Sequence, residues 1–198
     1  MRRSHLALVI VLVLLLLDQS SKIWIKTHMY LGQEYQIADW FVIHFTENAG
    51  MAFGMKFGGD TGKLLLSLFR IGAVILIGFY IRNLVRQKAH NGFIAAMSLI
   101  FAGAMGNIID SVFYGEIFTS SSAQVAQFVG PGKGYGSWLH GHVVDMLYFP
   151  LVEGIMPDWV PYWGGDYFIF FRPVFNIADS AITVGVSMII LFQKRYFK

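Results

Sequence analysis

The sequence predicts an all-α integral membrane protein with four transmembrane helices, a small β-containing outer segment and an extended outer loop. Of its 198 residues, 56% are hydrophobic and 14% are charged, and the mean hydropathy is +0.56. Soluble domains carry about 25% charged residues. The apolar residues gather in four runs, each near the roughly 20 residues that a helix needs to cross a hydrocarbon core about 30 Å thick. These observations argue against a soluble domain.

The first apolar run follows two arginines and covers about residues 6–26, including the polar stretch from Asp18 to Lys22. A cleaved signal peptide would share the basic start and the apolar run, but no small-x-small cleavage site follows here. We therefore expect an uncleaved span. The fourth span is expected to enter at about Pro173, because proline is favoured at the first position of a helix. The three later spans are expected at about residues 64–82, 93–113 and 174–192.

Lysine and arginine residues set the expected orientation, because short flanks that carry them stay in the cytoplasm. They cluster before the first run, between the second and third, and after the fourth: Arg2, Arg3, Arg82, Arg86, Lys88, Lys194, Arg195 and Lys198. Both termini should therefore face the cytoplasm, and residues 29–63 and 114–173 should lie outside. Residues 35–37 and 41–45 are expected to form short strands, whereas Gly- and Ser-rich stretches predict loops in the second outer segment. No internal repeat divides residues 1–198, which we treat as one domain.

The composition limits the possible chemistry. The chain has no cysteine, which excludes disulfides, thiolate metal sites and cysteine nucleophiles. Its net charge is +3, and the basic residues form short clusters without interleaved aromatics, so a nucleic-acid partner is not expected. Any catalysis must use Asp, Glu, His, Ser, Lys or Tyr, and we expect no cofactor and no metal.

Three carboxylates fall inside expected spans, where a charged group is costly and marks a candidate functional site. At about 1.5 Å per residue, Asp18, Asp110 and Asp179 come from three different helices and lie in the outer third of the membrane. Arg70 falls at a similar depth in the second span. It is a candidate counter-charge, or an arginine that extends to the interface.

The spacing around these acids predicts polar helix faces. Two asparagines each precede an aspartate by three residues, so that the two can share one face: Asn107 with Asp110, and Asn176 with Asp179. Asp18 and Lys22 are four residues apart and can neutralise each other. For Asp110 we favour the role of a buried carboxylate that holds backbone amides of a loop over a direct chemical role. Gly103 and Gly106 should allow a neighbouring helix to approach closely.

The outer loop supplies a further acid in an apolar setting. Hydrophobic residues flank Asp145 on both sides, so its carboxyl group should lose hydration and have a raised pKa. If Asp145 meets Asp179, for which we favour a chemical role, the two can share one proton as in an aspartic protease. His140 and His142 could instead bind a metal with Asp145. They lack a third strong ligand nearby, and histidines near lipid headgroups are the simpler interpretation.

Five motifs, in this order, make the chain resemble the lipoprotein signal peptidases, or signal peptidase II family, over nearly its whole length. They are Asp18-Gln19-x-x-Lys22 in the first span, Asn48-Ala49-Gly50-Met51-Ala52-Phe53-Gly54 outside, Gly106-Asn107-Ile108-Ile109-Asp110 in the third span, Val143-Val144-Asp145 in the outer loop, and Phe175-Asn176-Ile177-Ala178-Asp179 at the fourth span. Each motif alone is weak, whereas five in one order are specific.

The resemblance implies a multi-pass protein of the bacterial inner membrane. Such a protein is an aspartyl endopeptidase that removes the signal peptide of prolipoproteins just before a diacylglyceryl-modified cysteine, near the periplasmic face. Its partners would be these precursors and membrane lipids, and we expect a monomer because one chain supplies both aspartates. By the matching of motifs, Asp145 and Asp179 are the catalytic pair. The residues that support the site or hold substrate are then Asp18, Lys22, Asn48, Gly50, Asn107, Asp110 and Asn176.

The chain departs from the family pattern after its third and fourth motifs. The family usually has a basic residue directly after that motif, where this chain has Ser111. Insertions at about residues 114–140 and 150–172 lengthen the links around Asp145, which puts in doubt which loop covers the substrate. Glu116, in the stretch Tyr114-Gly115-Glu116, is an alternative first acid if the outer loop is built differently.

Other classes of function remain open from the sequence. A proton- or cation-coupled carrier would also use intramembrane carboxylates, but it predicts acids spread across the bilayer, whereas here they gather near one face. A structural membrane protein would use the acids only to tie the helices together. A serine nucleophile at Ser20 or Ser21 with Lys22 as its base is weaker, since Asp18 is the nearer partner of Lys22.

Overall fold

The computed structural model describes residues 2–49, 59–122, 124–150, 152–170 and 173–197. Within these ranges, four helices are long and apolar enough to cross a membrane: α1 (Arg3–His28), α2 (Gly59–Arg86), α3 (Asn91–Ile109) and α5 (Ile177–Tyr196). The backbone of α3 continues through one π-helical turn, η2 (Asp110–Tyr114), into the short α4 (Gly115–Ile117). The prediction of four spans is confirmed.

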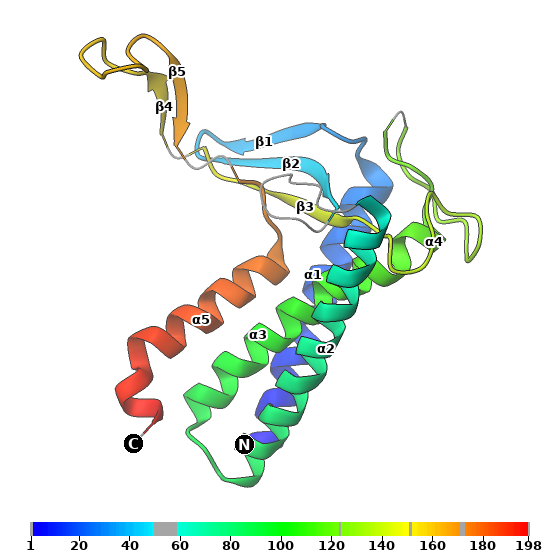
Figure 1. Cartoon of the computed structure of the whole chain (residues 1–198), viewed down its shortest axis with the longest axis vertical. Coiled ribbons are helices and arrows are strands. Elements are labelled where there is room, and N and C mark those ends of the chain that lie inside the picture. Colours follow the sequence, from blue (N-terminus) through cyan, green and yellow to red (C-terminus); the bar gives the residue numbers. More distant parts are fainter. Residues whose placement is uncertain (1, 50–58, 123, 151, 171–172, 198) are drawn as a thin grey trace.

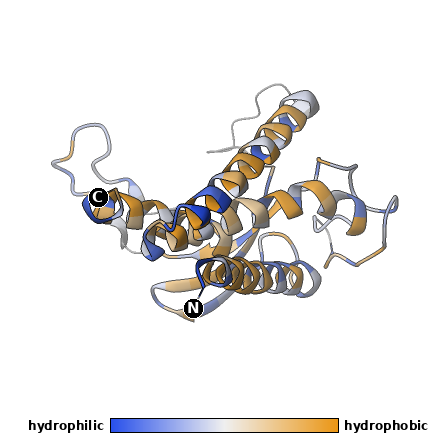
Figure 2. Ribbon diagram, turned by 90° about the horizontal axis from the view of Figure 1, so that it is seen from below, coloured by the Kyte–Doolittle hydropathy of each residue, from blue (hydrophilic) through white to orange (hydrophobic). Residues whose placement is uncertain are grey.

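The long helices expose apolar side chains, as expected of surfaces that face lipid. A helix is the form in which a spanning segment pairs all its backbone N–H and C=O groups internally. Leu16, Phe69 and Leu76 are each about 70% exposed in the isolated chain. Figure 2 shows apolar residues along the length of these helices.

Both termini and the turn between α2 and α3 lie at one end of the helix bundle, opposite the strands (Figure 1). The guanidinium of Arg3 donates to the carbonyl oxygen of Ala89 at 3.1 Å and ties the start of α1 to this turn. The basic clusters that set the expected orientation are therefore all at the same end of the molecule. This end is called the basic end below, and the opposite end the sheet end.

An antiparallel sheet covers the sheet end in the order β1 (Glu34–Ala38), β2 (Phe41–Asn48), β3 (Val143–Tyr148). The expected strands at 35–37 and 41–45 are confirmed and extended. The loops expected at the Ser- and Gly-rich stretches, residues 119–122 and 130–134, are confirmed, and the second outer segment also contains β3 and a hairpin of β4 (Val152–Ile155) and β5 (Tyr167–Phe170). Its strands form through pairing that the local sequence does not show: β3 lies against β2, with Asp145 opposite Thr46.

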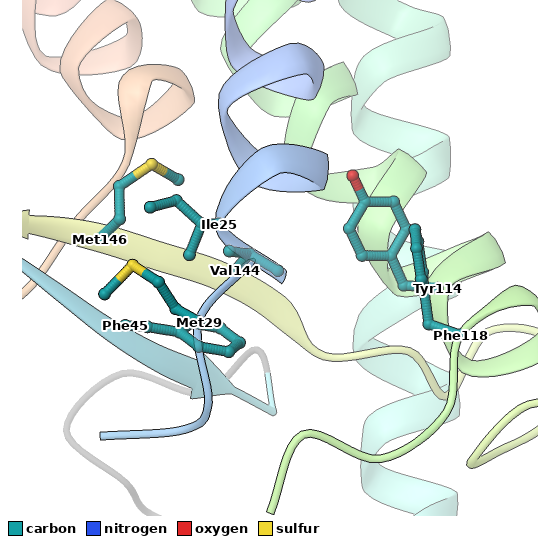
Figure 3. Packing of buried hydrophobic residues seen from close by; sticks show 7 residues of the cluster. All are labelled: Ile25, Met29, Phe45, Tyr114, Phe118, Val144 and Met146. Atoms are coloured by element: carbon teal, nitrogen blue, oxygen red, sulfur yellow. The ribbon is translucent and has the colours of Figure 1, made fainter. Parts of the chain in front are cut away.

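A buried apolar cluster joins the sheet to the helix ends beneath it (Figure 3). Its members come from α1, β2, η2, β3 and the chain after α4: Ile25, Met29, Phe45, Tyr114, Phe118, Val144 and Met146. Phe45 and Val144, on adjacent strands, have no exposed surface. Burial of this cluster fixes β3, and with it Asp145, over the end of α1.

The third span lies between α1 and α5 and packs closely on both. A Cβ atom on Gly103 would lie 2.3 Å from the carbonyl oxygen of Ala178, and one on Gly106 would lie 2.5 Å from Oδ2 of Asp18. The expectation that these glycines allow close helix approach is confirmed.

The fourth span begins three residues later than the predicted 174–192, and Pro173 lies outside the helix. Asn176 is the N-cap of α5: its side chain accepts from the N–H of Asp179, and the Asp179 side chain accepts from the N–H of Asn176. This capping box satisfies two backbone donors, which proline at the first position would not do. Asp179 therefore lies in the first turn of α5 and not deeper in the span.

Candidate active site

A buried ion cluster lies where α1 and α3 meet at the sheet end. The ammonium of Lys22 is 3.0 Å from Oδ2 of Asp18 and 2.9 Å from Oδ2 of Asp110, and it donates to Oδ1 of Asn107 at 2.8 Å. Lys22 and both aspartates are completely buried. The expectation that Asp18 and Lys22 neutralise each other is therefore incomplete, because the lysine serves two carboxylates from two helices.

The two carboxylates also hold the backbone of the neighbouring elements. Oδ1 of Asp18 accepts the N–H of Ala178 on α5 at 3.0 Å, and Oδ2 of Asp110 accepts the N–H of Val144 on β3 at 3.2 Å. Asp110 is therefore a buried carboxylate that holds a backbone amide, although this amide belongs to strand β3 and not to a loop. One cluster thus fixes both the start of α5 and the middle of β3.

Two further members of the cluster were missed from the sequence. The Gln19 side-chain amide donates to Oδ1 of Asp110 at 2.9 Å, and the hydroxyl of Tyr114 donates to Oε1 of Gln19 at 3.2 Å. Gln19 precedes Lys22 by three residues and so lies on the same helix face, which is a signal that sequence reasoning could have used.

Asn176 connects Asp145 to Asp179. Its Nδ2 donates to Oδ1 of Asp145 at 2.7 Å, and its Oδ1 accepts the N–H of Asp179 at 2.9 Å. Its own backbone N–H donates to Oδ2 of Asp179 at 3.3 Å. Asn176 is completely buried. The Asn176 side chain therefore holds Asp145 of β3 in place relative to Asp179 of α5.

The chain before α5 is attached to β3. Phe175 and Leu147 exchange two backbone hydrogen bonds, of 3.0 and 2.7 Å. This bridge brings Asn176 beside Asp145 although the two residues are far apart in the chain. The apposition of the aspartates is thus supported by the backbone as well as by the Asn176 side chain.

Asn107 joins the ion cluster to the aspartate pair. Its Nδ2 donates to Oδ1 of Asp179 at 2.8 Å, while its Oδ1 accepts from Lys22 and, at 3.2 Å, from Nδ2 of Asn176. Ser111, at the position of the basic residue that the resemblance implies, donates its hydroxyl to the carbonyl oxygen of Asn107 at 2.9 Å. The predicted polar faces of α3 and α5 therefore meet in one continuous network.

Burial is the main influence on the acidity of Asp145. The residue is only 4% exposed. This burial, and then the charge of Asp179, raise the pKa of Asp145 to about 7, although hydrogen bonds from Asn176 and Asn48 act in the opposite direction. The expected raised pKa is confirmed. Asn48 thus contacts Asp145, whereas Gly50 lies outside the described residues.

The other ionisable candidates have different partners. Arg70, on α2, interacts with Asp179 through its charge, in agreement with its interpretation as a counter-charge. The carboxylate of Glu116 accepts the N–H groups of Gly132 and Trp138, at 2.6 and 3.2 Å, and so holds the inserted loop. Glu116 therefore contacts the inserted loop, whereas Asp145 is the acid that Asn176 joins to Asp179.

The histidines of the outer loop contact neighbouring groups of the protein. Nδ1 of His140 lies 2.8 Å from the carbonyl oxygen of Trp138 and 3.1 Å from the hydroxyl of Ser137. Nδ1 of His142 is 3.1 Å from Oε2 of Glu47. In the part of the chain that the structure describes, no three His, Cys, Asp or Glu side chains gather in a way that could hold a metal ion. The hydroxyl of Ser21 donates to the carbonyl oxygen of Asp18, and the ammonium of Lys22 is held by Asp18 and Asp110, so the structure does not support Lys22 as the base of a serine nucleophile.

A second buried ion pair lies beside the site and was not predicted. Lys26 of α1 contacts Oε1 of Glu47 on β2, and the same oxygen accepts from the hydroxyl of Ser121 at 2.8 Å. Burial acts to raise the pKa of Glu47, but hydrogen bonds from His142, Lys26 and Ser121 and the charge of Lys26 lower it to about 2. Glu47 therefore ties α1, β2 and the inserted loop together as a permanent anion.

Comparisons with known proteins agree with this arrangement. A family model described as signal peptidase (SPase) II matches residues 10–194. The chain is similar to the lipoprotein signal peptidase of Porphyromonas gingivalis, with 51% identity over 94% of this chain and 81% of the relative. It is also similar to that of Amoebophilus asiaticus, with 41% identity over 93% and 76% of the two chains.

Two solved structures share the fold. Both are described as bacterial membrane enzyme structures obtained by the in meso method. The first has a TM-score of 0.59 and 26% identity, covering 93% of this chain and 90% of the other. The second has a TM-score of 0.58 and 24% identity, covering 96% and 87%.

Proposed function

Because the chain belongs to the signal peptidase II family, we propose that it is an aspartyl endopeptidase that cuts diacylglyceryl-modified prolipoproteins just before the lipidated cysteine. The observation that carries this proposal is the pair Asp145 and Asp179, joined through the buried Asn176. Two carboxyl groups in one site, one of them with a raised pKa, offer the acid and the base that peptide hydrolysis needs.

In this mechanism Asp145 carries the proton and Asp179 is ionised. The two N–H groups that donate to Asp179, from Asn107 and Asn176, complement a carboxylate. Asp179 takes a proton from a water molecule while the oxygen of that water attacks the scissile carbonyl carbon. At the same time Asp145 protonates the carbonyl oxygen. Collapse of the resulting diol breaks the C–N bond: the leaving nitrogen takes the proton from Asp179, and Asp145 recovers its own.

The remaining site residues would position the aspartate pair and the substrate. Asp18, Lys22, Asp110 and Asn107 keep α5 and β3 in place through the contacts described above. Asn48, at the end of β2, and Gly50 after it would hold the extended substrate. Each of these residues acts on the aspartate pair or on the substrate.

We place the protein in the bacterial inner membrane with its basic end in the cytoplasm, because lysine and arginine resist translocation. The sheet end and the aspartate pair would then face the periplasm. That position suits a substrate held by its signal helix on one side of the cut and by its diacylglyceryl group on the other. We propose a monomer, since one chain supplies both aspartates.

Cleavage should depend on the lipid of the precursor. Purified protein in lipid nanodiscs should cut a diacylglyceryl-modified precursor, and mass spectrometry should find a product that begins with the lipidated cysteine. The matched control is the same precursor with alanine in place of that cysteine, which cannot be lipidated and should remain intact. Equal cutting of both precursors would contradict the proposed substrate, and no cutting of either would favour a carrier or a structural protein.

The rate should fall as the pH rises above about 7. Asp145, with its pKa raised to about 7, holds its proton below that pH and loses it above, so it can no longer protonate the carbonyl oxygen. In this limb kcat/KM should drop by about tenfold per pH unit. Asp39, an exposed acid in the turn between β1 and β2, offers a control, since Asp39→Asn should leave the profile unchanged. A rate that is constant from pH 6 to pH 9 would contradict this role of Asp145.

A further inference from the structure

The β4–β5 hairpin is an insertion between the two proposed catalytic aspartates, and it stands apart from the rest of the fold. In the described part of the chain, β4 and β5 pair with each other and with no strand of the three-stranded sheet. Figure 1 shows the hairpin at the upper left, beyond the three-stranded sheet and separate from the helix bundle. Its surface is therefore available to a partner at the level of the sheet end.

Large aromatic side chains cover the end of this hairpin. Trp159 is 82% exposed, Tyr162 99% and Trp163 65%, and two further apolar side chains below them, Ile155 and Tyr167, are also well exposed. An exposed cluster of this kind on a protein surface marks a contact site. Tryptophan and tyrosine, which have an apolar ring and a polar atom, are the residues enriched where a membrane protein meets the headgroups.

The tip that carries these aromatic residues has a defined shape. Its backbone is closed by hydrogen bonds from Met156 N–H to the Asp166 carbonyl oxygen at 2.8 Å and from Gly165 N–H to the Met156 carbonyl oxygen at 2.9 Å. A third, from Gly164 N–H to the Val160 carbonyl oxygen, is 3.0 Å long. The tip is thus prepared to present its rings without a large loss of conformational entropy on binding.

The chain limits how far the base of the hairpin can lie from the start of α5. Six residues separate Phe170, the end of β5, from Ile177, the start of the membrane-spanning α5. Even fully extended, this connection reaches no more than about 25 Å. The base of the hairpin therefore stays within that distance of the point where α5 enters the bilayer.

The charge of the hairpin favours one kind of partner. Residues 152–170 contain Glu153, Asp158 and Asp166 and no lysine or arginine. Anionic lipids attract basic segments, so this hairpin has no electrostatic reason to prefer them. Its aromatic cluster fits a surface of zwitterionic phospholipid, bound through ring burial and not through charge.

We propose that the β4–β5 hairpin is an interfacial anchor, whose Trp159, Tyr162 and Trp163 insert among the phospholipid headgroups of the leaflet at the sheet end. This contact attaches the link between β3 and α5 to the bilayer surface. It depends on the membrane-spanning helices and not on the catalytic role of the aspartates.

The absence of cysteine from the chain makes a direct test possible, because Tyr162→Cys creates a unique labelling position. The full-length variant is labelled with an environment-sensitive fluorophore and reconstituted in phosphatidylcholine nanodiscs, with or without a phospholipid that carries a nitroxide quencher near its headgroup. Lys133→Cys, in an exposed polar loop, is the matched control. The label at 162 should emit at shorter wavelength, be quenched by the nitroxide lipid and resist iodide in water, and the label at 133 should show the reverse.

The aromatic side chains are tested in the same assay. With the label at Asp158→Cys, the added changes Trp159→Ser and Trp163→Ser should abolish the nitroxide quenching, and neither salt nor anionic lipid should strengthen or weaken it in the parent. The proposal is overturned if the label at 162 is quenched by iodide like that at 133. It is overturned equally if that label is protected from both quenchers, which would indicate that a protein, such as a second copy of the chain, covers the hairpin.

Discussion

Asp145→Asn and Asp179→Asn should each lower kcat for the lipidated precursor by at least roughly 10²–10⁴-fold, the range that positioned acid–base groups contribute. Asparagine has nearly the shape of aspartate but can neither hold the transferable proton nor accept one. In Asp145→Asn the amide oxygen can still accept the hydrogen bond that Asn176 donates to Oδ1 of Asp145. The loss of rate should therefore arise from chemistry and not from rearrangement.

The two variants differ in their expected effect on stability. Asp179 accepts hydrogen bonds with both carboxylate oxygens, one of them in the capping box of α5, and asparagine has a single oxygen to offer. Asp179→Asn should therefore cost about 0.5–2 kcal/mol, the usual value of a helix cap, whereas Asp145→Asn should not. Unfolding in mixed detergent micelles measures the loss of stability. Cleavage of the lipidated precursor, with Asp39→Asn as control, measures the loss of kcat. Full activity in either variant would refute the catalytic pair.

Lys22→Met should be the most destabilising of the single substitutions considered. It removes the one ammonium that contacts both Asp18 and Asp110, at 3.0 and 2.9 Å, and leaves two buried carboxylates without a counter-charge. Breaking a buried ion pair in this way costs about 3–5 kcal/mol. Activity should fall as well, because the same carboxylates hold the N–H groups of Ala178 on α5 and Val144 on β3.

Two controls separate the effect of burial from that of charge in general. Lys133→Met removes a lysine from an exposed loop and should leave the unfolding midpoint unchanged, since isolated surface charges contribute little. Adding Asp18→Asn and Asp110→Asn to Lys22→Met removes the unpaired charges and should restore part of the lost stability. If Lys22→Met unfolds at the same detergent composition as the parent protein, the ion cluster does not hold the helices together.

The membrane-spanning helices were predictable because their information is local. An apolar run of about 20 residues in lipid forms a helix because it must pair its own backbone N–H and C=O groups, independently of neighbouring segments. The start of α5 was predicted wrongly because a general preference of Pro173 was weighed above the Asn176–Asp179 capping box, which is also local and was present in the sequence. β3 could not be predicted in the same way, since its strand exists through pairing with β2, about a hundred residues earlier.

The acids of the site and the pairing of Asp145 with Asp179 were expected from the sequence, but most of the hydrogen bonds that connect the site were not. Intramembrane position singled out Asp18, Asp110 and Asp179, and apolar neighbours singled out Asp145. Gln19 could have been found from its spacing to Lys22 on one helix face. The role of Tyr114 and the pairing of Lys26 with Glu47 depend on how segments far apart in the chain meet, so the sequence showed no pattern for them.

By itself, the sequence determined that the chain has four segments long and apolar enough to cross a membrane, and that clusters of lysine and arginine flank these segments on one side. Those properties follow from the cost of placing polar groups in lipid, which acts on each segment separately. Only the tertiary structure decided that Lys22 serves two carboxylates and that Asn176 joins Asp145 to Asp179. Such contacts form where closely packed helices meet a sheet whose strands are far apart in the chain. A buried polar group there must hydrogen-bond to the partners that this packing places beside it.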